Sequence, residues 1–186
     1  NIALIYFNTK DLRMSIYFIN KCRRIGKRYK LPILKAFAYG LRSIVYVEAD
    51  ETKKAVSDVK KWITNNEYLK TDPLQGMIYI TVAKLLLKKV KVKDNIIKYF
   101  GSNEPEFYFK KAIEKSSNPM LSDTYIPSLI EYAIYLIKYA GNKVEALQVF
   151  KEAYQACITY NNISKRNVLE RVLNDLRIYD EVLNAL

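Results

Sequence analysis

Apolar side chains recur at intervals of three and four residues along almost the whole chain, and this spacing places them on one face of an α-helix. β-Branched residues, which favour strands, cluster at 44–47 and 90–92, but both clusters lie inside longer helical patterns. The pattern therefore predicts an all-α chain with more than about 60% of its residues in helices. Two of the clearest helical faces are Leu12, Ile16, Ile19, Cys22 and Ile25, and Val144, Leu147, Phe150, Tyr154, Cys157 and Ile158.

Prolines and glycines indicate where the helices begin and end. All five prolines fit the first turn of a helix, where proline is tolerated, and Gly101 and Gly141 fit helix C-termini. Gly40 is expected inside a helix, at a cost of about 1 kcal/mol relative to alanine, which indicates a closely packed neighbour. The predicted helices cover roughly 10–28, 32–48, 51–65, 73–92, 103–116, 124–140, 143–160 and 164–176, with a short helix at 178–185 and the end of another at 1–7.

A pattern of small, large and small side chains returns along the chain, with its positions four and three residues apart. Small residues allow neighbouring helices to approach, and the large residue fills the space between them. The last positions are 22, 62, 112 and 153, at intervals of 40, 50 and 41 residues. Trp62 departs from the pattern and is expected in the core. The four occurrences are Ser15, Ile19 and Cys22; Ala55, Val59 and Trp62; Pro105, Phe109 and Ala112; and Ala146, Phe150 and Ala153.

This pattern resembles the second helix of a tetratricopeptide repeat, and Gly141 and Asn142 stand where that repeat has its Gly-Asp turn. The interval near 40 residues is similar to the longer repeats of signal-transduction ATPases and maltose-activator-type regulators. The resemblance implies antiparallel helix pairs stacked as a right-handed solenoid, and an irregular helical bundle is the alternative. It implies one helical-repeat domain at 1–186, with about four helix pairs near 8–48, 49–92, 101–140 and 141–176 and a cap helix at 177–186.

Residues that carry catalysis or bind metals are scarce. The chain has no histidine, and Cys22 and Cys157 fall on apolar helical faces, where buried reduced thiols are common. Glu104 and Glu106 are two residues apart and therefore point to different faces of a helix. Gly101 is not followed by the glycine and lysine of a phosphate-binding loop. We therefore predict a chain that is not an enzyme and that holds neither a cofactor nor a metal.

Basic residues are concentrated in the first half of the chain. Residues 1–100 hold 21 Lys or Arg against 8 Asp or Glu, whereas residues 101–186 hold 10 against 11. Two clusters lie at expected helix C-termini, where the helix dipole favours each cation by about 0.3 to 1 kcal/mol. They are either solvated helix ends or, where stacking brings them to one edge, a basic strip for an acidic partner or for phosphates. The candidate strip comprises Lys21, Arg23, Arg24, Lys27, Arg28, Lys30, Lys84, Lys88, Lys89, Lys91 and Lys93.

The resemblance implies a non-catalytic protein–protein interaction scaffold, such as the sensor or partner-binding region of a larger regulator. The expected partner is another protein or a peptide, of acidic character, or a second copy of the chain. One alternative is a nucleic-acid-binding or transcription-regulatory protein that uses the basic N-terminal half. Another is an accessory region that senses a small ligand for an ATPase domain.

Two further features bear on where the protein acts. The longest apolar runs, such as Met77 to Ala83, are broken by lysine well before the roughly 20 residues that a membrane span needs. We therefore predict no membrane partner and a cytoplasmic location. Asn1 to Ile5 show neither a start methionine nor the pattern of a signal peptide, so we expect a fragment of a longer chain.

Overall fold

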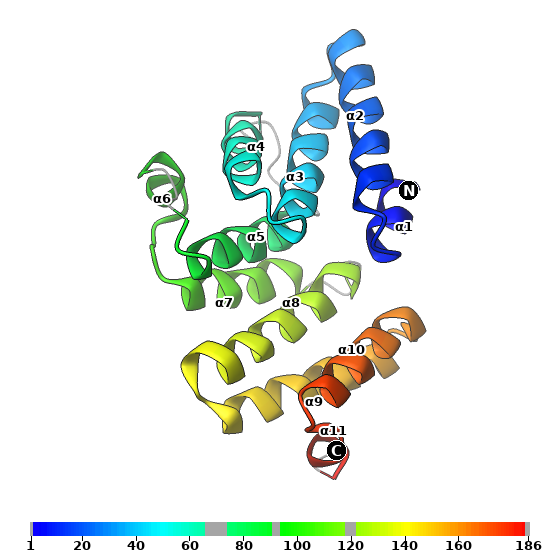
Figure 1. The fold of residues 1–186 in the computed structure, drawn as a ribbon, viewed down its shortest axis with the longest axis vertical. Helices are drawn as coiled ribbons and strands as arrows, with labels where there is room; N and C mark the ends of the chain where they lie inside the picture. Colours follow the sequence, from blue (N-terminus) through cyan, green and yellow to red (C-terminus); the bar gives the residue numbers. More distant parts are fainter. Residues whose placement is uncertain (1, 66–73, 91–93, 118–121, 185–186) are drawn as a thin grey trace. The chain divides into compact units, whose positions relative to one another are not determined.

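The computed structural model describes residues 2–65, 74–90, 94–117 and 122–184 (Figure 1). Of these residues, 84% lie in helices and none lies in a strand, which confirms the all-α prediction. Contacts divide the chain into two compact units, Asn1–Pro105 and Glu106–Leu186. Each unit is described by itself.

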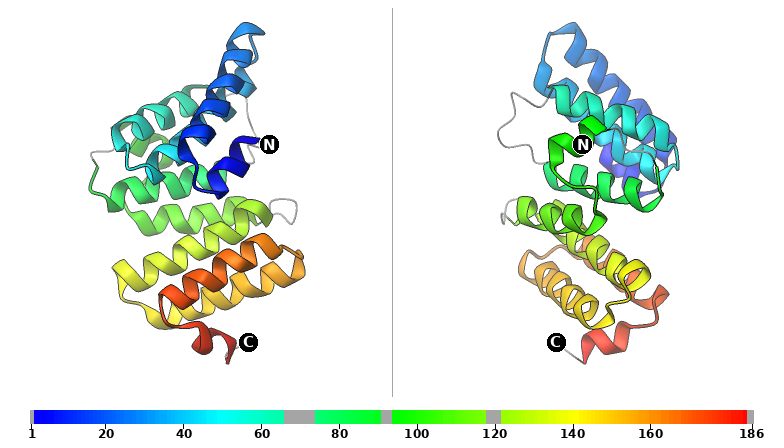
Figure 2. Two further views of the ribbon diagram at one scale, coloured as in Figure 1. Left: turned by 45° about the vertical axis from the view of Figure 1, so that its right-hand side comes forward. Right: turned by 90° about the vertical axis from the view of Figure 1, so that its left-hand side faces the viewer.

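The first unit is built around one buried helix. This helix, α3, packs against α2, α4 and α5, and α2 and α3 lie side by side in Figures 1 and 2. Every residue from Gly40 to Val45 is buried, as expected for a helix that is covered on all sides. The elements of this unit are α1 (Ile2–Asn8), α2 (Leu12–Arg28), α3 (Pro32–Glu48), α4 (Thr52–Asn65), α5 (Gln75–Leu87) and α6 (Asp94–Phe100).

The second unit has α9 at its centre, in contact with α8, α10 and α11. Ala112, Ala146 and Ala153 are fully buried, which confirms that these small positions lie between helices. Phe109 and Phe150, the large residues of the same pattern, are also buried. The elements are α7 (Pro105–Ser116), α8 (Ser122–Tyr135) with a π-helical extension η3 (Leu136–Ala140), α9 (Lys143–Thr159), α10 (Ile163–Asp175) and α11 (Tyr179–Leu183).

Five helices end in the same kind of turn. In each turn one residue that is not glycine has a left-handed backbone, with φ between 48° and 58°. The next N–H donates to a carbonyl five residues back, for example Leu31 N–H to Gly26 O at 2.8 Å, which is the Schellman geometry. A left-handed backbone costs an ordinary side chain about 1 to 2 kcal/mol, so tertiary packing overrides local preference here. The five residues are Lys30, Asp50, Lys89, Asn161 and Arg177.

The proline positions agree with the sequence prediction in part. Pro32 and Pro105 are the first residues of α3 and α7. Pro127, expected near a helix start, lies inside α8, because that helix already begins at Ser122. Pro73 and Pro119 lie outside the described residues.

Gly40 lies where the sequence indicated close packing. A Cβ atom at this position would come within 3.0 Å of Trp62 Cδ1 and 3.2 Å of Leu74 Cδ1. Trp62 is completely buried, as predicted. Its ring stacks on that of Phe100, with the centroids 6.3 Å apart. Phe100 belongs to α6, a helix of seven residues that was not predicted, since so short a segment shows almost no periodicity.

Candidate binding groove

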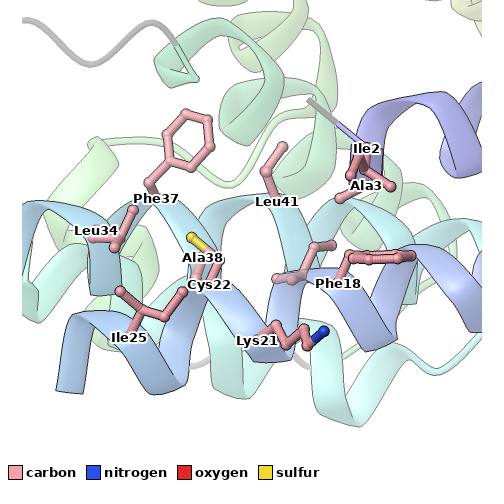
Figure 3. Close-up of a pocket in the computed structure, with 11 residues that line it drawn as sticks. Ile2, Ala3, Phe18, Lys21, Cys22, Ile25, Leu34, Phe37, Ala38 and Leu41 are labelled. Carbon is pink, nitrogen blue, oxygen red and sulfur yellow. The ribbon is translucent and has the colours of Figure 1, made fainter. Parts of the chain in front are cut away.

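An apolar groove lies between α1, α2 and α3 in the first unit (Figure 3). Its volume is about 390 Å³. Lys21 supplies the one charged side chain among its lining residues, and Cys22 supplies a thiol. The other lining residues are Ile2, Ala3, Phe18, Ile19, Ile25, Leu34, Phe37, Ala38 and Leu41.

Three helices contribute to the groove lining. Ser15 Oγ donates a hydrogen bond to the Ala3 carbonyl at 2.9 Å, which places α1 beside the first half of α2. The second half of α2 and the start of α3 contribute Cys22, Ile25 and Leu34 to the lining (Figure 3).

Two large apolar side chains of the groove lining remain exposed. Ile2 and Ile25 are 53% and 48% exposed. Single exposed apolar residues are normal, whereas exposed apolar residues that line a hollow are typical of an interaction surface. Five further large apolar residues of α1 to the start of α3 are exposed but do not line the groove: Ile5, Tyr17, Tyr29, Leu31 and Ile33.

One of the two long helices that form the groove walls is strongly basic. α2 contains six Lys or Arg and no Asp or Glu, whereas α3 contains Lys35, Arg42 and Glu48. The Lys21 ammonium lies 5.5 Å from the Tyr17 ring centroid and 5.9 Å from that of Phe18. Cation–π interactions with both rings therefore stabilise it. A partner that fills the groove therefore meets positive charge at its margin.

A buried ion pair holds the groove helices in place. Arg42 on α3 donates through Nε and Nη2 to both carboxylate oxygens of Asp58 on α4, at 2.5 Å and 2.8 Å. Its Nη1 donates to Asn20 Oδ1 on α2, at 2.6 Å. The pKa of Arg42 is raised above its ordinary value, mainly by the hydrogen bond to Asp58.

Two tyrosines stack around this pair. The Arg42 guanidinium lies 5.5 Å from the Tyr39 ring and 5.6 Å from the Tyr46 ring. Lys61 and Lys54 lie over the same two rings, each at 5.5 Å. Sequence reasoning missed the network, although an arginine in the most apolar part of α3 was a signal for a buried partner.

The first predicted basic cluster surrounds the end of α2. Arg24 and Lys27 are exposed, and the Arg28 guanidinium lies 5.5 Å from the Tyr29 ring. Arg23 is half-buried, and its Nε is buried without a hydrogen-bond partner among the described residues. Lys30 is the left-handed residue of the turn into α3.

The second predicted basic cluster takes part in ion pairs. Lys84 Nζ lies 2.8 Å from Glu48 Oε1. Lys88 Nζ lies 2.7 Å from Asp50 Oδ1 and also donates to the Val47 carbonyl at 3.1 Å. Lys89 has a left-handed backbone after α5, and Lys91 and Lys93 lie outside the described residues.

The described members of the two basic clusters lie near different ends of α3. The end of α2 adjoins the start of α3, whereas Lys84 and Lys88 pair with residues at and just after the end of α3. Since α3 has 17 residues, about 25 Å separates its ends. Lys84 and Lys88 therefore lie near the opposite end of α3 from the end of α2, and a single strip formed by all the candidate residues stays a prediction.

The two cysteines differ in exposure. Burial raises the pKa of the Cys157 thiol to about 11, and it also raises the pKa of the partly exposed Cys22 thiol. Neither thiol has the lowered pKa of a catalytic nucleophile. The described parts of the chain contain no group of three or more His, Cys, Asp or Glu residues placed to hold a metal ion.

Comparison with models of known protein families, with curated proteins and with solved structures finds no significant match. Among the helices in the described ranges, none combines the length and apolar character that crossing a bilayer requires. The shape and charge of the groove are therefore the basis for assigning a function.

Proposed function

We propose that the chain is a non-catalytic protein-binding domain that holds a segment of its partner in the α1–α2–α3 groove. The observation that carries this assignment is the groove itself, an apolar hollow of about 390 Å³ with exposed Ile2 and Ile25 in its walls. Grooves between packed helices commonly receive a partner segment through a few apolar anchors. Lys21, at the margin of the groove, favours a partner segment that carries a complementary negative charge.

We also infer the finer architecture, a tetratricopeptide-like solenoid of antiparallel helix pairs. Two observations support it. The same Schellman turn recurs at the ends of α2, α3, α5, α9 and α10. Five small positions of the sequence pattern are completely buried, namely Ser15 and Ala55 in the first unit and Ala112, Ala146 and Ala153 in the second, whereas Cys22 and Pro105 are partly exposed. Stacked repeats of this kind present extended binding surfaces.

The absence of histidine from the whole sequence supports a non-catalytic role, because the commonest general base is missing. Both cysteines are unpaired. Unpaired cysteines are typical of proteins in a reducing compartment, which supports a cytoplasmic location.

A second candidate function is nucleic-acid binding at the end of α2. Tyr29 is 61% exposed and lies beside the Arg28 guanidinium, and this combination suits base stacking together with phosphate contact. Titration of duplex and single-stranded oligonucleotides against the protein and a variant with Arg23, Arg24, Lys27 and Arg28 changed to glutamine tests it. Each lost phosphate contact should lower the slope of log affinity against log salt by about 0.7 to 0.9.

The protein-binding proposal is tested by selecting binders from a random peptide library displayed on phage. The Ile25→Glu variant places a charge inside the groove, and Ile33→Glu places the same charge on an isoleucine that is similarly exposed but does not line it. We expect selected peptides to compete with one another and to lose affinity for Ile25→Glu alone. Selected peptides that bind both variants equally well would overturn the assignment of the groove.

A further inference from the structure

We propose that the turn between α2 and α3 is a membrane-docking tip, which inserts its apolar side chains among the headgroups of an anionic lipid surface. The tip comprises residues 27–33, which are the end of α2, the turn and the start of α3. None of these residues lines the groove, so the inference goes beyond the proposed function. It follows from the exposure, the shape and the charge of the tip.

The tip is exposed along its whole length. All seven residues from Lys27 to Ile33 are exposed to solvent. Leu31 and Ile33 are 46% and 57% exposed, and Tyr29 and Pro32 between and before them are exposed as well. Single exposed apolar residues are normal, whereas several of them in one continuous exposed stretch are typical of an interaction surface.

The tip projects from the first unit. In Figures 1 and 2 the turn between α2 and α3 extends beyond the ends of α1 and α4. A projecting turn offers no hollow that could enclose a peptide. It can, however, enter a flat interface with all of its exposed side chains at once, as docking to a lipid surface requires.

The charge of the tip matches an anionic surface. Lys27, Arg28 and Lys30 belong to the tip, and no Asp or Glu occurs between Asp11 and Glu48. Each Lys or Arg near an anionic leaflet strengthens binding by roughly fivefold. The Arg28 guanidinium lies 5.5 Å from the Tyr29 ring. Tyrosine and arginine both suit the headgroup region, because each has an apolar body and a polar end.

Helix stability does not account for the leucine at position 31. Leu31 is the N-cap residue of α3, and its side chain makes no capping hydrogen bond. Ser, Thr, Asp and Asn are preferred at this position, because their side-chain oxygens accept hydrogen bonds from the free N–H groups of the first turn. Residues that break such a local rule are expected at functional sites. We therefore assign Leu31 to contact with the partner surface.

The aliphatic side chains favour lipid over nucleic acid. Tyr29 and the cations also suit the second candidate function, but Leu31 and Ile33 carry no group that pairs with phosphates or bases. Both side chains can be buried between lipid headgroups. Contact with one leaflet requires no spanning segment, and the lack of such a segment was the ground on which the sequence predicted no membrane partner.

The test is cosedimentation of the protein with vesicles of phosphatidylcholine alone, or of phosphatidylcholine and phosphatidylserine in equal parts. The double variant Leu31→Ser, Ile33→Ser removes apolar side chains from the tip, and a triple variant changes Arg24, Lys27 and Arg28 to glutamine. Two control variants make the same changes at exposed residues elsewhere: Ile158→Ser with Ile163→Ser, and Lys53, Lys60 and Lys138 to glutamine.

Insertion is measured separately from attraction. Leu31→Trp places a fluorophore on the tip, and phospholipids that carry bromine on their acyl chains quench a tryptophan that reaches them. Ile158→Trp places the same fluorophore on an exposed residue of the second unit. Trp62 is completely buried and contributes a constant background. We expect quenching of Leu31→Trp and none of Ile158→Trp.

We expect the native protein to bind the mixed vesicles at least about tenfold more tightly than phosphatidylcholine alone. Both tip variants should lose at least about tenfold in affinity for the mixed vesicles, and both control variants should stay within about twofold of the native protein. Leu31→Ser should not impair folding, because serine is a better N-cap than leucine. Circular dichroism establishes that each variant is folded.

Three results would overturn the inference. Equal binding of the mixed vesicles by the native protein and by Leu31→Ser, Ile33→Ser would show attraction by the cations alone. A lack of quenching in Leu31→Trp would show that the tip does not enter the lipid. Tighter binding of an oligonucleotide than of the mixed vesicles, lost in the glutamine variant of the tip alone, would assign the tip to nucleic acid.

The outcome is independent of the proposed function. Peptides selected for the groove should bind Leu31→Ser, Ile33→Ser as tightly as the native protein, because neither residue lines the groove. Failure of vesicle binding with intact peptide binding would therefore remove the docking tip and leave the protein-binding groove in place.

Discussion

Both carboxylate oxygens of Asp58 accept hydrogen bonds from the guanidinium of Arg42, at 2.5 Å from Nε and 2.8 Å from Nη2. The Asp58 side chain is only 2% exposed, so this ion pair lies inside the first unit. It joins α3 to α4, and the additional hydrogen bond to Asn20 includes α2. One buried polar network therefore joins α2, α3 and α4.

Removing one member of this pair should be strongly destabilising. Asp58→Leu leaves the Arg42 charge buried without its partner and should lower the free energy of unfolding by about 3 to 5 kcal/mol. The double variant Arg42→Met, Asp58→Leu should recover most of that loss, because no uncompensated charge remains. Urea denaturation followed by the fluorescence of Trp62, the one tryptophan of the chain, measures both effects. A single variant as stable as the native protein would contradict the structural role of the pair.

Enlarging a small residue between helices should overpack the second unit. Ala153 is completely buried on α9, so Ala153→Leu should lower the free energy of unfolding by about 1 to 3 kcal/mol. Gln148→Leu introduces the same side chain at an exposed position of the same helix and should have little effect. Thermal melting followed by circular dichroism compares the two variants. Equal melting temperatures would show that Ala153 does not lie where α9 packs.

Relieving a left-handed backbone should stabilise the turn between α2 and α3. Lys30 has φ of 53°, so Lys30→Gly should raise the free energy of unfolding by up to about 1 kcal/mol. Lys27→Gly, inside α2, should lower it by about 1 kcal/mol, because glycine is a poor helix former. Urea denaturation with Trp62 fluorescence again provides the measurement. A loss of stability in both variants would argue against the Schellman turn.

The ion pair between Glu48 and Lys84 should make the first unit sensitive to acid. Burial opposes ionisation of Glu48, but the nearby ammonium groups, that of Lys84 above all, outweigh it and lower its pKa below the ordinary value of 4.5. The resulting stabilisation is complete above pH 4.5 and is lost as the pH falls through the lowered pKa.

We therefore expect Lys84→Met to lose stability at neutral pH and to show a smaller further loss between about pH 5 and pH 3 than the native protein. Lys89→Met removes an exposed cation from the same region and should leave the pH profile unchanged. Trp62 fluorescence during urea denaturation at a series of pH values provides the profile. Parallel profiles for all three proteins would contradict the assigned role of Lys84.

Local patterns predicted most of the helices. The helices expected at roughly 32–48 and 143–160 agree within one residue with α3 and α9, because proline and Gly141 mark their boundaries. The burial of Ala112, Ala146 and Ala153 followed from the spacing of small and large residues. Boundaries failed where no such residue stands: the expected helix at 73–92 runs five residues past the end of α5 at Leu87, and α6 was not predicted.

The candidate site was predicted less well than the helices, because the groove depends on how α1, α2 and α3 pack against one another. The sequence identified Lys21 and Lys84 as members of basic clusters, but it could not show that one faces a groove and the other pairs with Glu48. Both arrangements join residues far apart in the chain. Their positions depend on packing between helices, which no local periodicity encodes.

Composition and spacing by themselves determined that this chain is helical, that its N-terminal half is basic and that alanines lie between its helices. These properties are local, because they depend on the residue types within one or two helical turns. Tertiary structure alone decided that α1, α2 and α3 line a groove and that Arg42 on α3 pairs with Asp58 on α4. It also decided that Lys84 and Lys88 lie near the C-terminal end of α3, where they pair with Glu48 and Asp50. These arrangements depend on how apolar surfaces of segments distant in sequence pack against one another. That packing is determined by the whole fold and not by any local pattern.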